Sequence, residues 1–283
     1  MRAASPRIAV CFFGITRSLR FTFPTIRDNV LTPARAAGEA RIFAHFFEQD
    51  TIENPRTGEY VTVDPKEYLL LAPDELRLEP SECCLEQWDF GRLANYADVW
   101  NDGHKTTRNL VHQLHSLHCV TAMASDWNPD LYVFVRPDLR YHDSLAPILS
   151  RAWNGPDETA WIPLWLSCGG HNDRFAVIRG GRVARKYGMR ASRALDYCAG
   201  VNGPVHAERL LAFALEGERV RRIATRATRI RANGVEWWES FSFTGIENLH
   251  ARLERTSTPS ILKRVGHRGL RAVQQVAELP FPR

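Results

Sequence analysis

The chain of 283 residues lacks the features that define several classes of protein. No apolar run approaches the roughly 18–20 residues needed to cross a bilayer, so we expect no membrane-spanning helix. The amino-terminal stretch has a short apolar part without a clean small-residue cleavage site, and we interpret it as a first strand rather than a signal peptide. Internal repeats and low-complexity segments are absent as well. What remains is the composition of an ordinary globular protein, with 44% hydrophobic and 24% charged residues.

The cysteines lack the spacing of a zinc site. None lies in a CxxC pair or at a Cys/His spacing of the zinc kind, so the sequence predicts no structural zinc. Most lie inside apolar segments, which predicts reduced, partly buried thiols and a cytoplasmic location. The six residues are Cys11, Cys83, Cys84, Cys119, Cys168 and Cys198.

The common nucleotide-binding motifs are missing too. The chain has no GxxxxGK[ST] loop and no GxGxxG, so a dinucleotide-binding fold has no direct support. Its net charge of +5 is concentrated in Arg219–Arg231 and Lys263–Arg271. These basic runs lack interleaved aromatic residues, which argues against nucleic acid as a partner. They are either solvated faces or surfaces for anionic membranes or substrate phosphates.

Short β-branched and aromatic runs indicate the strands of an α/β fold. The strands expected at Arg7–Gly14 and Ala40–Gln49 are separated by a helical pattern that Pro24 disturbs, which is the signature of a βαβ unit. We therefore predict a Rossmann-like, mostly parallel central sheet flanked by helices. Further strands are expected at Leu131–Val135, at Thr159–Ser167, at 175–180 and once or twice within 220–234, and further helices at His104–Trp127, at Gly180–Tyr187 and at 205–217.

The organisation predicted is a single α/β domain over residues 1–255 and a basic helical tail over 256–283. Within the tail, Ile261–Val276 has an amphipathic pattern. One interpretation is peripheral contact of this helix with an anionic membrane, at the inner face of the cytoplasmic membrane. The other is a helix packed on the domain. The basic residues that would make the membrane contact are Lys263, Arg264, Arg268 and Arg271.

Polar residues follow three of the expected strands. They are Gly14–Arg17, Arg136–Asp138 and Gly169–Arg174. If the sheet is parallel, all three segments lie at the same edge, where open α/β sheets bind their ligands. This coincidence favours a functional interpretation of residues that would be unremarkable separately.

Asp138, directly after the strand and Pro137, is the first candidate. A carboxylate in this place can bind Mg²⁺ or Mn²⁺, and the cation can hold a diphosphate. The alternative is a residue that only caps a turn after the proline. Arg136 would either pair with Asp138 or clamp a phosphate. Asp143 is a second possible ligand, or the N-cap of the helix that follows.

Two further carboxylates are candidates for ligand binding or for acid–base chemistry. Asp173 either binds sugar hydroxyls or acts as a catalytic base, or it forms a buried ion pair with Arg174 that fixes the turn. Glu208 opens an amphipathic helix, where the helix dipole alone favours an acid. If Glu208 faces the cleft, it could deprotonate an acceptor hydroxyl.

The loop after the first strand enters a helix, and such a junction binds anions through backbone N–H groups. Gly14, Thr16 and Arg17 are therefore candidate binding residues for a phosphate-bearing ligand.

Taken in order, several of these motifs resemble a family of sugar-transferase-like proteins from bacterial and viral polysaccharide loci. The motifs are "IAVCFFGITRSL", "YVFVRPDL", "NDRFAV", "HAERLL" and "IRANG", and the resemblance covers most of residues 7–234. It implies an A-type glycosyltransferase fold, a nucleoside-diphosphate sugar as donor and an acidic motif that holds Mn²⁺ or Mg²⁺. By position, the segment from Arg136 to Asp138 would be that motif. The family pattern has two aspartates, whereas Arg136 stands in place of the first, which puts metal dependence in doubt.

The function predicted is transfer of a sugar to a polysaccharide or lipid-linked glycan. In this hypothesis Asp138 contacts metal and diphosphate, Arg136 neutralises phosphate charge, and Asp173 or Glu208 orients or deprotonates the acceptor. Gly14, Thr16, Arg17 and Arg174 complete the predicted site. One alternative is a sulfotransferase, since "GITRSLRFT" superficially resembles a phosphosulfate-binding loop. The other is a non-catalytic protein that retains the fold.

Overall fold

The structure is a computed structural model, and it describes residues 5–54, 59–98, 101–237 and 239–241. These residues contain a seven-stranded sheet with the order β10-β8-β9-β6-β1-β2-β5. Every neighbouring pair is parallel except the two pairs made by β9, which runs against β6 and β8. The predicted α/β fold with a mostly parallel sheet is therefore confirmed. The strands are β1 (Arg7–Gly14), β2 (Glu39–Glu48), β5 (Glu75–Pro80), β6 (Leu131–Val135), β8 (Thr159–Pro163), β9 (Ala176–Arg179) and β10 (Arg219–Ile223).

Two small sheets accompany the large one. Strands β7, β11 and β12 form a three-stranded antiparallel sheet, and β3 pairs with β4 in a hairpin. Because β7 follows β6 after only three residues, the small sheet holds the chain close to the point where β6 ends. The bounds are β3 (Thr51–Asn54), β4 (Glu59–Thr62), β7 (Leu139–Tyr141), β11 (Ala227–Ile230) and β12 (Glu236–Trp237).

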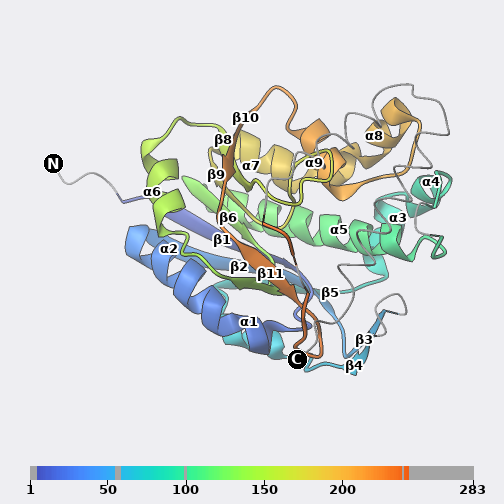
Figure 1. Cartoon of the computed structure of the whole chain (residues 1–283), viewed down its shortest axis with the longest axis horizontal. Coiled ribbons are helices and arrows are strands. Elements are labelled where there is room, and N and C mark those ends of the chain that lie inside the picture. Colours follow the sequence, from blue (N-terminus) through green and yellow to red (C-terminus); the bar gives the residue numbers. More distant parts are fainter. Residues whose placement is uncertain (1–4, 55–58, 99–100, 238, 242–283) are drawn as a thin grey trace. The chain divides into compact units, whose positions relative to one another are not determined.

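Helices cover both faces of the large sheet (Figure 1). The apolar core on one face includes residues of α1, α2 and α6, and the core on the other includes residues of α5, α7 and α9. Among the described residues, no helix is both long and apolar enough to cross a membrane. The α-helices are α1 (Leu19–Ile26), α2 (Thr32–Ala37), α3 (Cys83–Gln87), α4 (Phe90–Ala94), α5 (Lys105–Asp126), α6 (Ala146–Asn154), α7 (Gly181–Gly188), α8 (Ala194–Val201) and α9 (Ala207–Ala214). Short 3₁₀ turns lie at Glu67–Leu71 and Arg190–Arg193.

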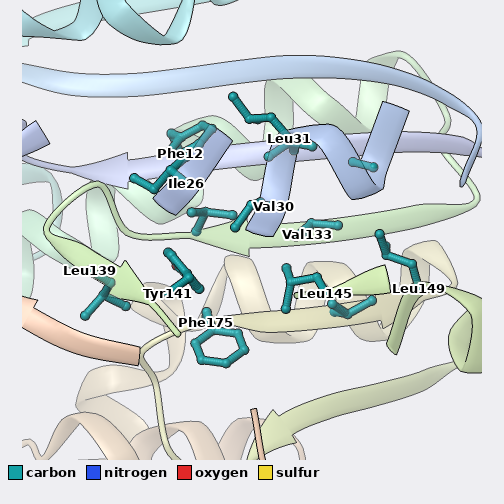
Figure 2. Close-up of a cluster of buried hydrophobic side chains, with 14 of the residues drawn as sticks. Phe12, Ile26, Val30, Leu31, Val133, Leu139, Tyr141, Leu145, Leu149 and Phe175 are labelled. Carbon is teal, nitrogen blue, oxygen red and sulfur yellow. The ribbon is translucent and has the colours of Figure 1, made fainter. Parts of the chain in front are cut away.

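Alternation along the strands divides the core between the two faces. In β1, Phe12 belongs to the cluster under α1, α2 and α6, whereas its neighbours Cys11 and Phe13 belong to the cluster under α5 and α7. Figure 2 shows the first cluster, in which Phe12 and Val133 of the sheet meet helical residues such as Ile26. The buried stretches of β1 and β6 consist of apolar and aromatic residues, so the polar groups of these two strands lie only where the strands end.

The disturbance predicted near Pro24 is present, but it does not end the helix. Pro24 lies inside α1, and the chain continues through a π-helix at Arg27–Leu31 into α2. The Asn29 carbonyl accepts a hydrogen bond from the Leu145 backbone N–H at 2.8 Å, and the Asn29 side chain donates to the Tyr141 carbonyl at 2.7 Å. The wider turn therefore connects this helical run to the segment that leads from β7 into α6.

Several predicted elements differ in detail. The strand expected at Thr159–Ser167 ends at Pro163, which has no N–H to continue the pairing. The one or two strands expected within 220–234 are two strands, β10 in the seven-stranded sheet and β11 in the three-stranded sheet. Asp143 is not a helix cap, because its carboxylate accepts hydrogen bonds from the backbone and guanidinium of Arg226 at 2.8–3.0 Å. The predicted tail and the boundary at residue 255 lie outside the described residues.

Candidate functional site

The three polar strand ends lie at one edge of the sheet, as predicted. Strands β1 and β6 run parallel, with Phe12 opposite Val135, so the segments that begin at Gly14 and Arg136 leave the sheet side by side. Strand β9 runs the other way, with Ala176 opposite Phe134, so residues just before its start reach the same edge. The reversed strand thus brings Asp173 to the edge by a route that a purely parallel sheet would not offer.

Asp138 is the centre of the contacts at this edge. It is 2% exposed, and its carboxylate accepts a bidentate pair of hydrogen bonds from Arg136 at 3.0 and 2.9 Å. A third bond comes from Arg17 at 2.8 Å. Burial alone would raise the pKa of Asp138, but the two guanidinium groups overcome it and hold the pKa well below its ordinary value. Asp138 is therefore an ionised carboxylate at any physiological pH.

The backbone at this point is fixed from two directions. The Thr22 hydroxyl of α1 donates to the Pro137 carbonyl at 2.5 Å, and the Ile230 N–H of β11 donates to the Asp138 carbonyl at 2.8 Å. Pro137 and Asp138 are therefore held between the first helix and the small sheet.

A glutamine on α5 links this centre to the segment before β9. The Gln113 side chain accepts from Arg136 at 3.0 Å and donates to Asp173 at 2.9 Å. Asp173 is 5% exposed. Burial raises the pKa of Asp173, and the charges of Arg136 and Arg174 more than offset this, so that its pKa lies below the ordinary value. The sequence also allowed an ion pair between Asp173 and Arg174. In the described residues Asp173 contacts Gln113 instead, and Arg174 contacts Glu239.

Arg174 instead turns toward the end of the described chain. Its guanidinium lies 3.1 Å from a carboxylate oxygen of Glu239, and Arg229 of β11 lies 3.6 Å from the same oxygen. The side chain of Glu239 is 1% exposed. A part of the basic run Arg219–Arg231 is thus neither a solvated face nor a membrane surface.

Arg190 is a further arginine near Asp173, and it is 1% exposed. One of its terminal nitrogens donates to the Tyr187 carbonyl at 2.6 Å. Within the described residues, its Nε and other terminal nitrogen have no hydrogen-bond partner. Its charge is close enough to Asp173 to lower the pKa of that carboxylate. A buried guanidinium with unpaired donors is costly unless a ligand completes it.

Together these side chains form what we call the arginine network. Its arginines outnumber its carboxylates, which leaves buried positive charge. Consistent with this excess, burial and repulsion by Arg174 and Arg136 lower the pKa of the Arg229 guanidinium. The Nε atoms of Arg17 and Arg229 also lack partners among the described residues. The members are Arg17, Arg136, Arg174, Arg190 and Arg229 with Asp138, Asp173, Glu239 and Gln113.

A divalent cation does not fit Asp138 in this arrangement. Both carboxylate oxygens already accept guanidinium hydrogen bonds, and the groups around them are cations. Binding Mn²⁺ or Mg²⁺ would require the carboxylate to leave Arg136 and Arg17 and would place a doubly charged ion beside these two cations. The metal expected at Asp138 stays a prediction that these surroundings do not favour.

Glu208 is the more accessible of the two candidate catalytic carboxylates. It opens α9, its side chain is 16% exposed, and it lies 3.2 Å from His206. Its carbonyl accepts from the His171 N–H at 2.9 Å, so α9 is joined to the loop that leads to Asp173. A Cβ on Gly170 would lie 2.0 Å from that carbonyl oxygen, so only glycine allows this close approach.

The predicted anion site at the start of α1 does hold an anion, but the anion belongs to the chain itself. The N–H groups of Leu19 and Arg20 donate to the Glu67 carboxylate at 2.9 and 3.0 Å, and Glu67 is 4% exposed. The Gly14 N–H donates to Ser116 at 2.8 Å. Roles for Gly14 and Thr16 in binding a ligand therefore stay predictions, and of this loop Arg17 alone joins the network.

An open hollow borders the network at Glu239. Its lining comes from the residue that follows β7, from β11 and the residue before it, from β12, and from the end of the described chain. The residues are His142, Arg226, Thr228, Glu236, Glu239 and Phe241.

Sequence reasoning missed four members of the network: Gln113, Arg190, Arg229 and Glu239. Gln113 lies on a helix of which the sequence showed only the apolar face, and Arg190 and Glu239 do not follow any strand that the sequence predicted. Arg229 lies within the basic run Arg219–Arg231, which the sequence analysis interpreted only as a single charged surface. Its alternation with apolar neighbours in "ATRI" was the available signal, since it marks a strand with arginine on one face.

Comparison with known proteins finds similarity in structure but not in sequence. No family model and no curated protein sequence matches the chain, so the resemblance to the polysaccharide-locus family stays a prediction. Mouse xyloside xylosyltransferase 1 in its apo form is 10% identical with a TM-score of 0.38, over 78% of this chain and 85% of that one. The galactosyltransferase LgtC with donor and acceptor sugar analogues is 10% identical with a TM-score of 0.41, over 76% and 72%.

An active-site mutant of LgtC gives nearly the same match, with 9% identity, a TM-score of 0.41 and coverage of 76% and 71%. At these identities and TM-scores the similarities carry no argument about substrate or mechanism.

Proposed function

We propose that the protein is a glycosyltransferase that moves a sugar from a nucleoside-diphosphate sugar to a glycan acceptor. The observation that carries this proposal is the arginine network, a buried cationic site with unpaired guanidinium donors at the ligand-binding edge of an α/β sheet. A diphosphate supplies the anionic oxygens that such donors lack. The choice of a sugar as the transferred group rests on the sequence resemblance.

In this proposal arginines do the work expected of a metal ion. Arg190 and Arg17 offer free N–H groups to the diphosphate, and Asp138 keeps Arg136 and Arg17 in place by holding them on both sides. Fixed positive charge stabilises the negative charge that develops on the departing diphosphate. Guanidinium groups suit this role because they remain charged and bind phosphate through paired donors.

The transfer step needs a base for the acceptor. The acceptor hydroxyl oxygen forms the new bond to the anomeric carbon, and the bond from that carbon to the diphosphate oxygen breaks. The nucleoside diphosphate leaves with the electron pair, and the hydroxyl proton passes to a carboxylate. We assign this base to Glu208 rather than Asp173, because Glu208 is the more exposed of the two and is free of the arginine network. Asp173 then positions Gln113 and Arg136.

The direct test is ligand binding by the full-length protein. Uridine, guanosine, cytidine and thymidine diphosphates would be screened by thermal shift and calorimetry, each with EDTA and again with Mn²⁺. We expect at least one to bind in EDTA. Binding that strictly requires Mn²⁺ would refute the arginine mechanism while leaving a glycosyltransferase possible. Binding of adenosine bisphosphate but of no diphosphate would favour a sulfotransferase, and binding of none would refute the proposal.

Replacing Arg190 tests the network itself. Arg190→Met keeps much of the side-chain volume but removes the unpaired donors, and we expect the diphosphate to bind about 10–100 times more weakly, the range for hydrogen bonds to charged groups. Arg193→Met is the matched control, since Arg193 is nearby in sequence and its side chain is 45% exposed. Equal affinity of the two variants for the diphosphate would show that Arg190 does not contact it. Unfolding in urea without ligand shows whether each variant is folded.

A further inference from the structure

Away from the arginine network, four side chains with metal-ligand chemistry converge between the sheet and α5. His45 comes from β2, Glu79 from β5, and His115 and Cys119 from successive turns of α5. One ligating atom from each lies within 4.8 Å of all the others. The exposed fractions of the side chains of His45, His115 and Glu79 are 0%, 3% and 13%. We call these residues the His–Glu–Cys cluster.

The contacts in the cluster centre on one oxygen of Glu79. Its Oε2 lies 3.1 Å from Nε2 of His45 and 2.7 Å from Nε2 of His115. The Cys119 sulfur lies 3.4 Å from the same His115 nitrogen. In tetrahedral zinc sites the ligand atoms are about 3.3–3.7 Å apart, as bonds of 2.0–2.3 Å require. Small side-chain movements would bring the four atoms to such spacing.

The protonation of His45 shows why this arrangement is incomplete by itself. The Ser116 hydroxyl donates its proton to the His45 carbonyl at 2.7 Å and accepts from the Gly14 N–H at 2.8 Å. Having no proton left, it can only accept from His45 Nδ1, which lies 3.1 Å away. The proton of a neutral His45 is therefore on Nδ1, and its Nε2 lone pair points at the Glu79 carboxylate.

Two acceptors that face each other in a buried place repel unless a cation lies between them. Nearby Arg77 binds the other oxygen of Glu79, so its guanidinium does not separate these two acceptors. A bare imidazole nitrogen and a carboxylate are just the atoms that a transition metal takes as ligands.

From these contacts we propose that His45, Glu79, His115 and Cys119 form a structural site for a transition-metal ion of the zinc class. Imidazole and thiolate ligands select Zn²⁺ over Mg²⁺ or Ca²⁺, which require oxygen donors. Four protein ligands leave no open position, so the site would be structural rather than catalytic. This inference is independent of the proposed function and concerns a different set of residues.

The metal would tie together three elements, one of which is α5, the helix that supplies Gln113 to the arginine network. It would join β2, β5 and α5, and Ser116 would connect His45 to Gly14, where the β1 loop begins. No zinc-type spacing is visible along the chain, because two of the ligands come from separate strands. The pair His115 and Cys119, one helical turn apart, was the visible part of the pattern.

Binding would require two local changes. Cys119 is a buried free thiol, so the metal must displace its proton. His115 now accepts a hydrogen bond from the Trp88 indole on Nδ1 at 2.9 Å, which places its proton on Nε2. To bind metal through Nε2, the ring must move this proton to Nδ1 and release Trp88. Metal binding is therefore expected to change the fluorescence of Trp88 and to release protons.

The test uses full-length protein treated with chelator and titrated with Co²⁺, and separately with Zn²⁺. Exposed Cys168 is replaced by serine to remove an adventitious thiolate, whereas Cys83 is kept because its thiol donates to Glu79 Oε2 at 3.5 Å. We expect one equivalent of Co²⁺ to give the absorption of a tetrahedral site with a thiolate-to-cobalt charge-transfer band, and one equivalent of Zn²⁺ to abolish it. Zn²⁺ should also raise the melting temperature and change the fluorescence, the latter change being lost in Trp88→Phe.

Substitutions distinguish metal binding at the His–Glu–Cys cluster from metal binding at other thiols. Cys119→Ser should lose the charge-transfer band and bind Zn²⁺ at least tenfold more weakly, and His115→Asn should lose tetrahedral binding. Cys198→Ser is the matched control, another buried free thiol outside the cluster. Circular dichroism of the metal-free variants checks that they are folded. No stoichiometric binding by the parent protein, or a charge-transfer band retained in Cys119→Ser and lost in Cys198→Ser, would overturn the proposal.

Discussion

At the scale of single residues, the site is built on charges that are paired unevenly. Asp138 is held by two arginines, whereas Arg190 has donors without partners in the described part of the chain. A buried carboxylate of this kind gives little net stability compared with an apolar core, but removing it leaves its partners unpaired. Asp138 therefore has an organising role, and the binding capacity belongs to the arginines around it.

The same reasoning predicts the cost of neutralising Asp138. Asp138→Asn keeps the shape but leaves the buried Arg136 and Arg17 without a counter-charge, so the free energy of unfolding should fall by about 3–5 kcal/mol. Asp143→Asn is the control, since Asp143 also binds an arginine but its side chain is 35% exposed. There we expect a loss of about 1 kcal/mol or less. Urea unfolding measures both, and equal losses would contradict the importance of burial.

At the scale of elements, α5 connects the two sites. Gln113 joins the arginine network, Ser116 holds the Gly14 N–H, and His115 and Cys119 belong to the His–Glu–Cys cluster. These positions lie on successive turns of one helix, so a shift of α5 along its axis would disturb both sites together. In Figure 1 this helix crosses the face of the sheet above β1 and β2.

A second connection between elements is the contact of the loop before β9 with α9. Gly170→Ala would place Cβ 2.0 Å from the Glu208 carbonyl oxygen, so the loop or the helix must move, at a cost of about 1–3 kcal/mol. Gly91→Ala in α4 should have the opposite effect. The new Cβ meets nothing within 4 Å, and we expect the free energy of unfolding to rise by about 0.5–1 kcal/mol. Thermal unfolding distinguishes the two. If Glu208 is the base, Gly170→Ala should also lower turnover more than donor affinity.

At the scale of the whole molecule, stability should fall as the pH is lowered. Burial and the neighbouring Arg222 lower the pKa of His171 to about 4, against about 6.5 in an unfolded chain. Between these two values the unfolded state binds a proton that the native state does not, so acidification favours unfolding. The pKa values of His112 and His118 are lowered by burial as well and act in the same direction.

Unfolding experiments on chelated protein from pH 7 to pH 4.5 check this dependence. Because the His171 ring is partly exposed, we expect His171→Gln to reduce the loss of stability over this range by about 1 kcal/mol. An unchanged pH dependence in this variant would show that His171 titrates alike in the folded and unfolded states.

Much of this fold was predictable because its strands are continuous apolar runs. Arg7–Gly14 and Leu131–Val135 were readable as strands, and their polar ends correctly indicated where Arg17, Arg136 and Asp138 meet. The direction of β9 was not predictable, since a short apolar run looks the same in either orientation. Gln113 and Arg190 were missed because packing alone brings them to the site from distant parts of the sequence.

The reversal of β9 has a consequence for how such a molecule can change. Residues 164–175 leave the sheet after β8 and re-enter it one position away, without a crossover helix. Both ends of this segment are anchored by strand pairing, much as in a hairpin, so the winding of the sheet does not depend on its length. Its second half carries the buried Asn172 and Asp173, whereas residues 166–169 are partly or fully exposed. Insertions are therefore expected to be tolerated best at 166–169, where they leave the arginine network untouched.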